Sequence, residues 1–434
     1  MHVTRLPAGP TWLLYAAVWA FVGALSWTTG AVYLVREVGL TPLQLVLAGT
    51  ALEVAYTVTE VPTGVLADLY SRRLSLVVSA LVCGAGMAVV GLAGGAAAVL
   101  VGMAVWGVGW TFRSGAEDAW LADEVGPEGL GPAFQRGAQA ERVGGLAGIA
   151  AAVGLAVVDL RLPLLVAAAV AVVLALALAV LMPERGFQRP GRGERAGEQA
   201  GERAGLRASA GEAWRTASEG RRLVVRHPVL LLALGVALAS GAWSEGWDRL
   251  WEAHLLLDVG LPDFFGMSDV VWFGVLAAGT LLVSLAVAAP LVPRIERLEP
   301  HRLARLLALL HGALVVCALG FALAGGFAVA VAAYWATTVV RSLVSAPYRT
   351  WVNLSIGETR SRATVLSILG LADSAGEWSG GPALGWIGNR WGVSTALAVG
   401  AGLLTPVLVL LGRAGRRPQR DGRALTQGAR PSAG

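Results

Sequence analysis

The sequence contains no lysine, so all 34 of its basic residues are arginines. A Gly-rich phosphate loop needs a lysine, so this absence excludes an ATP-binding site of that kind. The chain has no nucleophile elbow, and its five histidines are scattered. The two cysteines, Cys83 and Cys317, supply neither a disulfide framework nor the spacing of a metal site. We therefore expect no enzyme activity, no cofactor and no bound metal.

Charge is scarce as well. Charged residues make up 15% of the 434 residues, and hydrophobic residues make up 56%, whereas a soluble domain has roughly 25% charged residues. This composition indicates an integral membrane protein. A helix needs about 20 residues to cross a hydrocarbon core of about 30 Å. We therefore predict an all-α fold with twelve transmembrane helices, at 11–35, 43–67, 74–94, 96–122, 138–158, 162–182, 229–257, 270–292, 303–325, 326–352, 363–388 and 393–412.

The arginines are distributed unevenly between the two sides of the predicted membrane. The outer loops hold only Arg36, Arg161 and Arg390, and most other arginines fall in inner segments. Positive charge marks the cytoplasmic side, so we expect a multi-pass plasma-membrane protein with both termini in the cytoplasm. The arginines are not interleaved with stacking aromatics, and we expect no nucleic-acid partner.

One long polar stretch, residues 183–228, divides the predicted helices into six and six. We expect a six-helix bundle at 1–182, a cytoplasmic linker at 183–228, a second six-helix bundle at 229–412 and a disordered tail at 413–434. Low apolar content predicts disorder in the linker to about residue 206. Residues 212–226 fit either an amphipathic helix on the membrane surface or a simple tether.

The two halves repeat each other. Arg113-Ser114 near the end of the fourth predicted span recurs as Arg341-Ser342 in the tenth, and Arg136 and Arg362 lead the fifth and eleventh. This order indicates two pseudo-symmetric six-helix bundles, an arrangement that many secondary transporters build around a site at the membrane midplane.

The turn between the second and third predicted spans carries a recognisable motif. It resembles the signature of the major facilitator superfamily at four of six defined positions, Gly64, Asp68, Arg72 and Arg73, and departs from it at Leu69 and Ser71. With twelve spans and a central loop, the chain looks like a prokaryotic member of an uncharacterised or multidrug-like branch. The resemblance implies the fold of this superfamily.

The same resemblance implies two roles. Arg113 resembles the span-four arginine associated with proton coupling in drug antiporters, although residues 144–154 lack the Gly-Pro pair that these antiporters carry in span five. Gly64, Asp68, Arg72 and Arg73, together with Asp123, would form a cytoplasmic gate.

Several other charges fall inside the predicted spans, where each costs about 2.5–3.5 kcal/mol without a partner or a watery cavity. They are candidates for proton coupling or substrate binding, and a hydrogen-bonded structural role is an equal alternative for Glu53. These residues are Glu53, Glu60, Glu117, Asp118, Arg341, Asp373 and Glu377.

The seventh predicted span is the densest of these sites. Three acids and three tryptophans follow helical spacing: Glu245, Asp248 and Glu252, and Trp243, Trp247 and Trp251. With Arg249, they could line an outer cavity in which acids attract a cation and indole faces hold an organic group. The alternative is an aromatic belt at the membrane interface.

From these features we expect a monomeric secondary transporter that works by alternating access and couples proton movement to the export of an amphipathic or cationic small molecule. Uptake of a small nutrient by the same fold remains open. An alternative of another class is a non-transporting membrane sensor or scaffold that acts through the 183–228 loop.

Overall fold

The computed structural model describes residues 5–187, 228–263, 266, 268–295, 298–356 and 362–416, and within these ranges it contains helices and loops but no strand. The first half comprises α1 (Ala8–Thr28), α2 (Gly30–Arg36), α3 (Pro42–Leu69), α4 (Arg72–Gly91), α5 (Ala96–Ser114), α6 (Glu117–Ala156) and α7 (Leu162–Leu181). The second half comprises α9 (Pro228–His254), the π-helix η1 (Leu255–Val259), α10 (Asp269–Ile295), α11 (Pro300–Ala322), α12 (Phe327–Ile356), α13 (Arg362–Trp391), α14 (Val393–Leu403) and α15 (Thr405–Arg416).

The predicted number of membrane spans agrees with the helices. Among the described residues, nine helical stretches are long and apolar enough to cross a membrane, and one of them, Ala96–Ala156, covers both the fourth and the fifth predicted spans. The remaining two spans correspond to α3 and α13, which are 28 and 30 residues long. Both carry intramembrane acids, which lower their hydropathy. The all-α membrane fold with twelve spans is confirmed.

Helix boundaries differ from the prediction in the fourth and fifth spans. α5 ends at Ser114, and Glu117 begins the next helix, so Arg113 and Glu117 lie on either side of a break rather than on one helix. α6 is itself kinked at Gly126, whose φ of 71° is a conformation that favours glycine. The kink at Gly126 falls between the predicted spans 96–122 and 138–158, whereas the break after Ser114 lies inside the predicted span 96–122.

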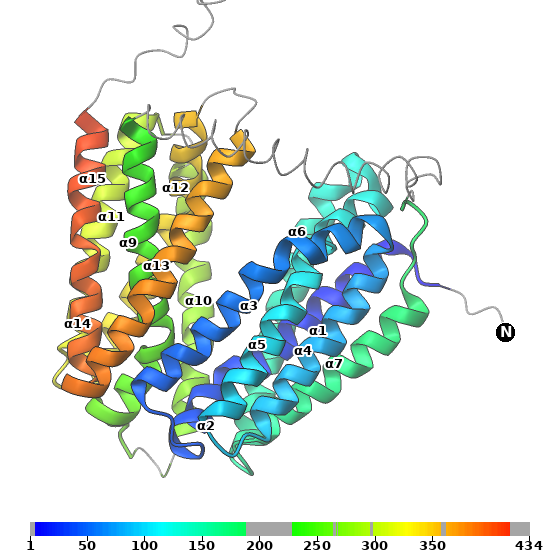
Figure 1. The fold of residues 1–434 in the computed structure, drawn as a ribbon, viewed down its shortest axis with the longest axis horizontal. Helices are drawn as coiled ribbons and strands as arrows, with labels where there is room; N and C mark the ends of the chain where they lie inside the picture. The colour runs from blue at the N-terminus through cyan, green and yellow to red at the C-terminus, as the bar shows by residue number, and fades with distance from the viewer. Residues whose placement is uncertain are drawn as a thin grey trace, which may run out of the picture. The chain divides into compact units, whose positions relative to one another are not determined.

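The described chain forms two compact units, which we describe separately. Unit 1 consists of Met1–Gln199, Asp248–Gly279 and Pro382–Val393. Within it α1 packs on α6 and α7, α4 packs on α5 and α7, and α3 packs on α5. Figure 1 shows α3, α5, α4 and α7 side by side.

Unit 2 consists of Ala200–Trp247, Thr280–Gly381 and Ser394–Gly434. Its α11 packs on α12 and α15. The hydroxyl of Tyr348 in α12 donates a hydrogen bond of 3.1 Å to the carbonyl oxygen of Ala233 in α9. These contacts join the first helix of the second half to its neighbours.

Glycines let the helices of both units approach closely. A methyl group added at Gly144 of α6 would collide with the carbonyl oxygen of Ala17 in α1. In unit 2, a methyl group at Gly241 of α9 would collide with the carbonyl oxygen of Asp373 in α13. Small residues at such contacts are how membrane helices gain packing energy, since lipid supplies no hydrophobic drive between them.

Three sequence predictions fall on residues 188–227 and 417–434, which lie outside the described residues. They are the disordered part of the linker, the helix at 212–226 and most of the disordered tail. The first four residues of that tail, 413–416, belong to α15.

Candidate functional site

A pocket in unit 1 collects side chains from both halves of the sequence. The space between its walls, counted out to the open mouth, is about 540 Å³. Its aromatic wall is a stacked pair, Trp27 of α1 and Trp106 of α5, with ring centroids 4.9 Å apart and planes inclined by 23°. Trp106 is buried, whereas Trp27 is 40% exposed and presents its ring to the pocket.

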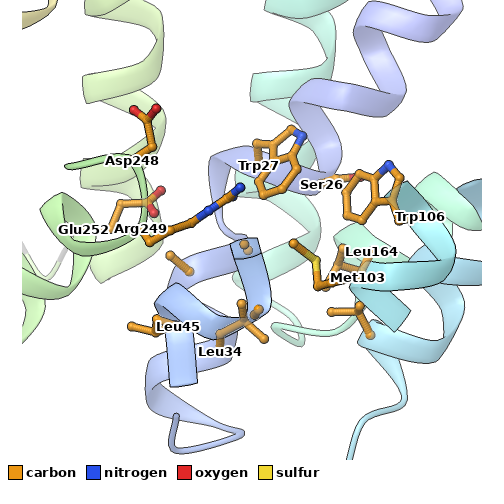
Figure 2. Close-up of a pocket in the computed structure, with 15 residues that line it drawn as sticks. Ser26, Trp27, Leu34, Leu45, Met103, Trp106, Leu164, Asp248, Arg249 and Glu252 are labelled. Atoms are coloured by element: carbon orange, nitrogen blue, oxygen red, sulfur yellow. The ribbon is translucent and has the colours of Figure 1, made fainter. Parts of the chain in front are cut away.

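The opposite wall of the pocket is charged. Asp248, Arg249 and Glu252 of α9 line it (Figure 2). The guanidinium carbon of Arg249 lies 5.5 Å from the centroid of the Trp27 ring, which is a cation–π contact. The pocket therefore combines an aromatic surface, an apolar lining, two acids and one arginine.

Two polar contacts in unit 1 join α2 and α3 to helices of the second half. Arg36 at the end of α2 forms an ion pair of 3.0 Å with Asp269 at the start of α10. The backbone N–H of Leu43 in the first turn of α3 donates a hydrogen bond of 2.9 Å to the side-chain oxygen of Asn389 in α13. Both pairs join residues that are more than two hundred positions apart.

The charged turn after α3 forms a cluster at another place in unit 1. Arg72 makes an ion pair with Asp123 of α6 and lies 3.8 Å from Asp68. It also donates a hydrogen bond of 2.6 Å to the carbonyl oxygen of Ala119. Gly64 of α3 lies close to the end of α5 instead, since a methyl group at Gly115 would come within 3.3 Å of its Cα atom. The structure thus brings together three of the four charged residues assigned to the gate.

The arginines repeated between the halves make the same kind of contact. Arg113 forms an ion pair with Glu117, and its guanidinium lies 5.1 Å from the ring centroid of Trp19 in α1. Arg341 of α12 lies 5.4 Å from the ring centroid of Trp243 in α9. In each half, an arginine of the fourth span stacks on a tryptophan of the first span. The arginines that repeat in the sequence therefore make equivalent contacts in the two halves.

Comparison with known families decides the classification. Residues 11–376 match the family model described as Major Facilitator Superfamily, which is most of the chain. The chain belongs to the major facilitator superfamily. No curated protein matches it.

Solved structures of superfamily transporters share its fold. The nucleoside transporter NupG superposes with a TM-score of 0.72 at 12% identity, with 95% of this chain and 100% of that chain covered. The peptide transporter POT gives 0.67 at 17%, with 95% and 97% covered. A bacterial homologue of the human lysosomal transporter Spinster, in an inward-facing and unoccupied conformation, gives 0.64 at 16%, with 94% and 95% covered. The family and the fold indicate a secondary transporter that crosses the membrane several times.

The structure places the residues of the seventh predicted span in different surroundings. Glu245 is buried in unit 2 and is not among the residues that line the pocket, whereas Asp248 is. Trp247 packs on Phe321, with ring centroids 5.0 Å apart, and Trp251 packs on Phe273 at 5.8 Å. Both tryptophans thus face aromatic partners on other helices.

The tryptophans that do line the pocket of this superfamily member, Trp27 and Trp106, were missed. They lie on different helices, and no spacing in the sequence relates them. Trp27 stands in an apolar run that otherwise indicates only a membrane span.

The remaining predicted acids lie apart from the pocket lining. Glu60 is exposed and accepts a hydrogen bond of 3.0 Å from the Tyr56 hydroxyl, and Glu53 is half-buried two turns earlier on α3. Asp373 and Glu377 are partly buried on α13 in unit 2. Asp118 is exposed at the start of α6.

Glu184, which follows α7, was also missed. Its carboxylate accepts hydrogen bonds of 2.9 and 2.8 Å from the hydroxyl of Ser71 and one of 3.0 Å from the backbone N–H of Arg73. An anion at a helix N-terminus is stabilised by the helix dipole, and Glu184 supplies it for α4. Arg73 therefore contacts this segment, and its guanidinium lies 3.4 Å from the carbonyl oxygen of Met182.

Proposed function

We propose that this superfamily member exports an amphipathic or cationic small molecule across the plasma membrane in exchange for protons, as a monomer with both termini in the cytoplasm. The observation that carries the proposal is the pocket in which the Trp27–Trp106 pair faces Asp248 and Glu252. An indole face attracts an organic cation by about 0.5–2 kcal/mol. The two carboxylates add a field that favours positive charge, and the apolar lining accommodates a hydrophobic body.

Alternating access supplies the mechanism. The two six-helix halves, 1–182 and 229–412, would rock about the site and expose it to each side in turn. The cluster of Asp68, Arg72 and Asp123 supports a gate on the cytoplasmic side, with Gly64 allowing close approach and Arg73 tied to the following segment.

Proton coupling is assigned to acids within the helices. Glu53, Asp373 and Glu377 are partly buried, and Glu245 is 4% exposed. A carboxylate at such a depth is costly unless it has a partner, so a proton that binds in one state and leaves in the other changes the relative stability of the two states. Each charge that crosses a potential of 100 mV carries about 2.3 kcal/mol.

Substitution of the pocket acids tests the substrate assignment. We expect the double variant Asp248→Asn/Glu252→Gln to reduce pH-gradient-driven transport of ethidium in proteoliposomes by at least about tenfold, since two charge-assisted contacts of about 1.5 kcal/mol or more are lost. The matched control Asp263→Asn changes an exposed acid of the loop before α10 and should transport at the wild-type rate. Wild-type rates in the double variant would remove the pocket from the transport pathway. Export itself predicts faster loss of ethidium from preloaded cells that produce the protein than from cells that do not.

The coupling acids are tested in the same liposomes. We expect at least one of Glu53→Gln, Glu245→Gln, Asp373→Asn and Glu377→Gln to abolish ethidium-driven proton movement, measured with an entrapped pH indicator dye. The affected variant should still exchange ethidium for ethidium, because exchange needs no net proton transfer. If all four variants move protons as the wild type does, these acids do not couple transport to protons.

A further inference from the structure

Arg249 places a cation of the protein on the aromatic wall of the pocket. Its guanidinium carbon lies 5.5 Å from the Trp27 ring centroid, and Figure 2 shows Trp27 between Arg249 and Trp106. Because Trp106 stacks on one side of Trp27, the arginine covers the side that faces the charged wall. A cationic substrate that binds to this indole face must therefore compete with the guanidinium of Arg249.

The arginine also has an alternative place within its own helix. Glu252 follows Arg249 by three residues, and side chains three apart in a helix are neighbours. Asp248 precedes it directly and lines the same pocket. A displaced guanidinium therefore has the carboxylate of Glu252 as a neighbour on the same helix face without leaving the pocket.

We propose that Arg249 is a built-in surrogate for the substrate, and that the substrate is a planar, delocalised organic cation which replaces the guanidinium on Trp27. This inference rests on the proposed function and narrows its substrate class. A guanidinium is a flat, delocalised and weakly hydrated cation, so the surface it occupies suits heteroaromatic cations, amidines and guanidines. When the substrate stacks on Trp27, Arg249 turns toward Glu252, three residues further along α9.

The surrogate would also set specificity. A ligand must displace the arginine, so its apparent affinity is lowered by the fraction of time for which the indole is covered. Neutral and anionic compounds lack the cation–π attraction to the indole that would offset this displacement. The arginine thus selects against compounds that only match the apolar lining, and in the empty transporter it keeps the indole covered.

Binding of ethidium, a planar cation, to the purified protein in detergent tests the proposal. We expect Arg249→Gln, which keeps most of the side-chain length but removes the charge, to lower the Kd for ethidium about tenfold. Arg249→Lys keeps a cation but loses the planar surface, so its Kd should fall between the two. Tetraphenylphosphonium, a cation that is not flat, should gain less than ethidium in Arg249→Gln.

A second pair of variants separates displacement from a change in packing. With Trp27→Leu in place, the indole is gone, and adding Arg249→Gln should no longer improve ethidium binding. An unchanged or higher Kd in Arg249→Gln would overturn the proposal, as would an equal gain in the Trp27→Leu background. If Arg249→Gln fails to fold, Arg249→Lys is measured in its place. The proposal requires that this variant also binds ethidium more tightly than the wild type does.

Failure of this inference is distinguishable from failure of the proposed function. The binding measurement uses no ion gradient and no membrane, so it reports on the arginine whether or not the protein exports anything. A tighter Kd in Arg249→Gln together with no gradient-driven flux would retain the surrogate and reject export. If transport depends on Asp248 and Glu252 but Arg249→Gln leaves the Kd unaltered, the proposed export is retained and the role of Arg249 as a surrogate is rejected.

Discussion

Replacement of Gly144 by valine is expected to leave little folded protein. Gly144 is buried in α6, where any side chain would collide with the carbonyl oxygen of Ala17 on α1. The obstacle is backbone, which cannot turn aside as a flexible side chain can, so α1 and α6 must separate along their shared surface. Overpacking typically costs about 1–3 kcal/mol and more where the backbone cannot yield. The yield of monodisperse protein after detergent extraction, and its thermal unfolding midpoint, measure this loss.

The neighbouring glycine provides a matched control. Gly145 lies one position further along α6, and a Cβ atom there meets nothing within 4 Å. Gly145→Val carries the same change in helix propensity as Gly144→Val but no collision, so its yield and midpoint should stay near those of the wild type. Equal losses in the two variants would show that the helix itself, rather than its contact with α1, sets the requirement for glycine.

Replacement of Glu117 by leucine is expected to destabilise the protein by about 3–5 kcal/mol, the usual cost of leaving one partner of a buried ion pair behind. The side chains of Arg113 and Glu117 are each only 19% exposed. Tyr15 also donates a hydrogen bond of 2.9 Å to Glu117, so the substitution removes a partner from two groups at once. The denaturant midpoint of the purified protein, followed by tryptophan fluorescence, measures the change.

Two further variants show whether charge is the cause. The double variant Arg113→Met/Glu117→Leu removes both charges and should recover most of the stability lost in Glu117→Leu, because an apolar pair can replace a buried ion pair at little cost. Tyr15→Phe removes one hydrogen bond and should cost about 1 kcal/mol. A double variant as unstable as the single one would assign the loss to packing.

Much of the fold was predictable because membrane insertion depends on local composition. Twelve apolar stretches of sufficient length predict twelve helices, and the family match and the fold confirm this architecture. The pairing of Arg72 with Asp123 was expected on another ground, the resemblance of residues 64–73 to the signature of the superfamily.

The pocket was only partly predictable. Asp248 and Arg249 stood out because charges are rare in apolar spans, whereas Trp27 and Trp106 resemble any other apolar residue of a span. Whether an indole faces a cavity or a neighbouring helix depends on the rotation of each helix, which hydropathy does not record. The same limit explains Trp247, which matched the helical spacing of a lining residue but packs on Phe321.

The stacking of Arg113 on Trp19 and of Arg341 on Trp243 has a consequence for the transport cycle. The first contact lies wholly within unit 1 and the second wholly within unit 2. Each stack also lies within one of the two halves, 1–182 and 229–412, that move in the proposed cycle. If each half moves as a rigid body, both stacks stay intact, and their free energy is the same in every state of that cycle. The free energy of the two stacks therefore does not change the barriers between those states. Each arginine then stabilises the fold of its own half. Loss of a stack should therefore lower the thermal stability of the protein, while the molecules that remain folded should keep most of their turnover rate.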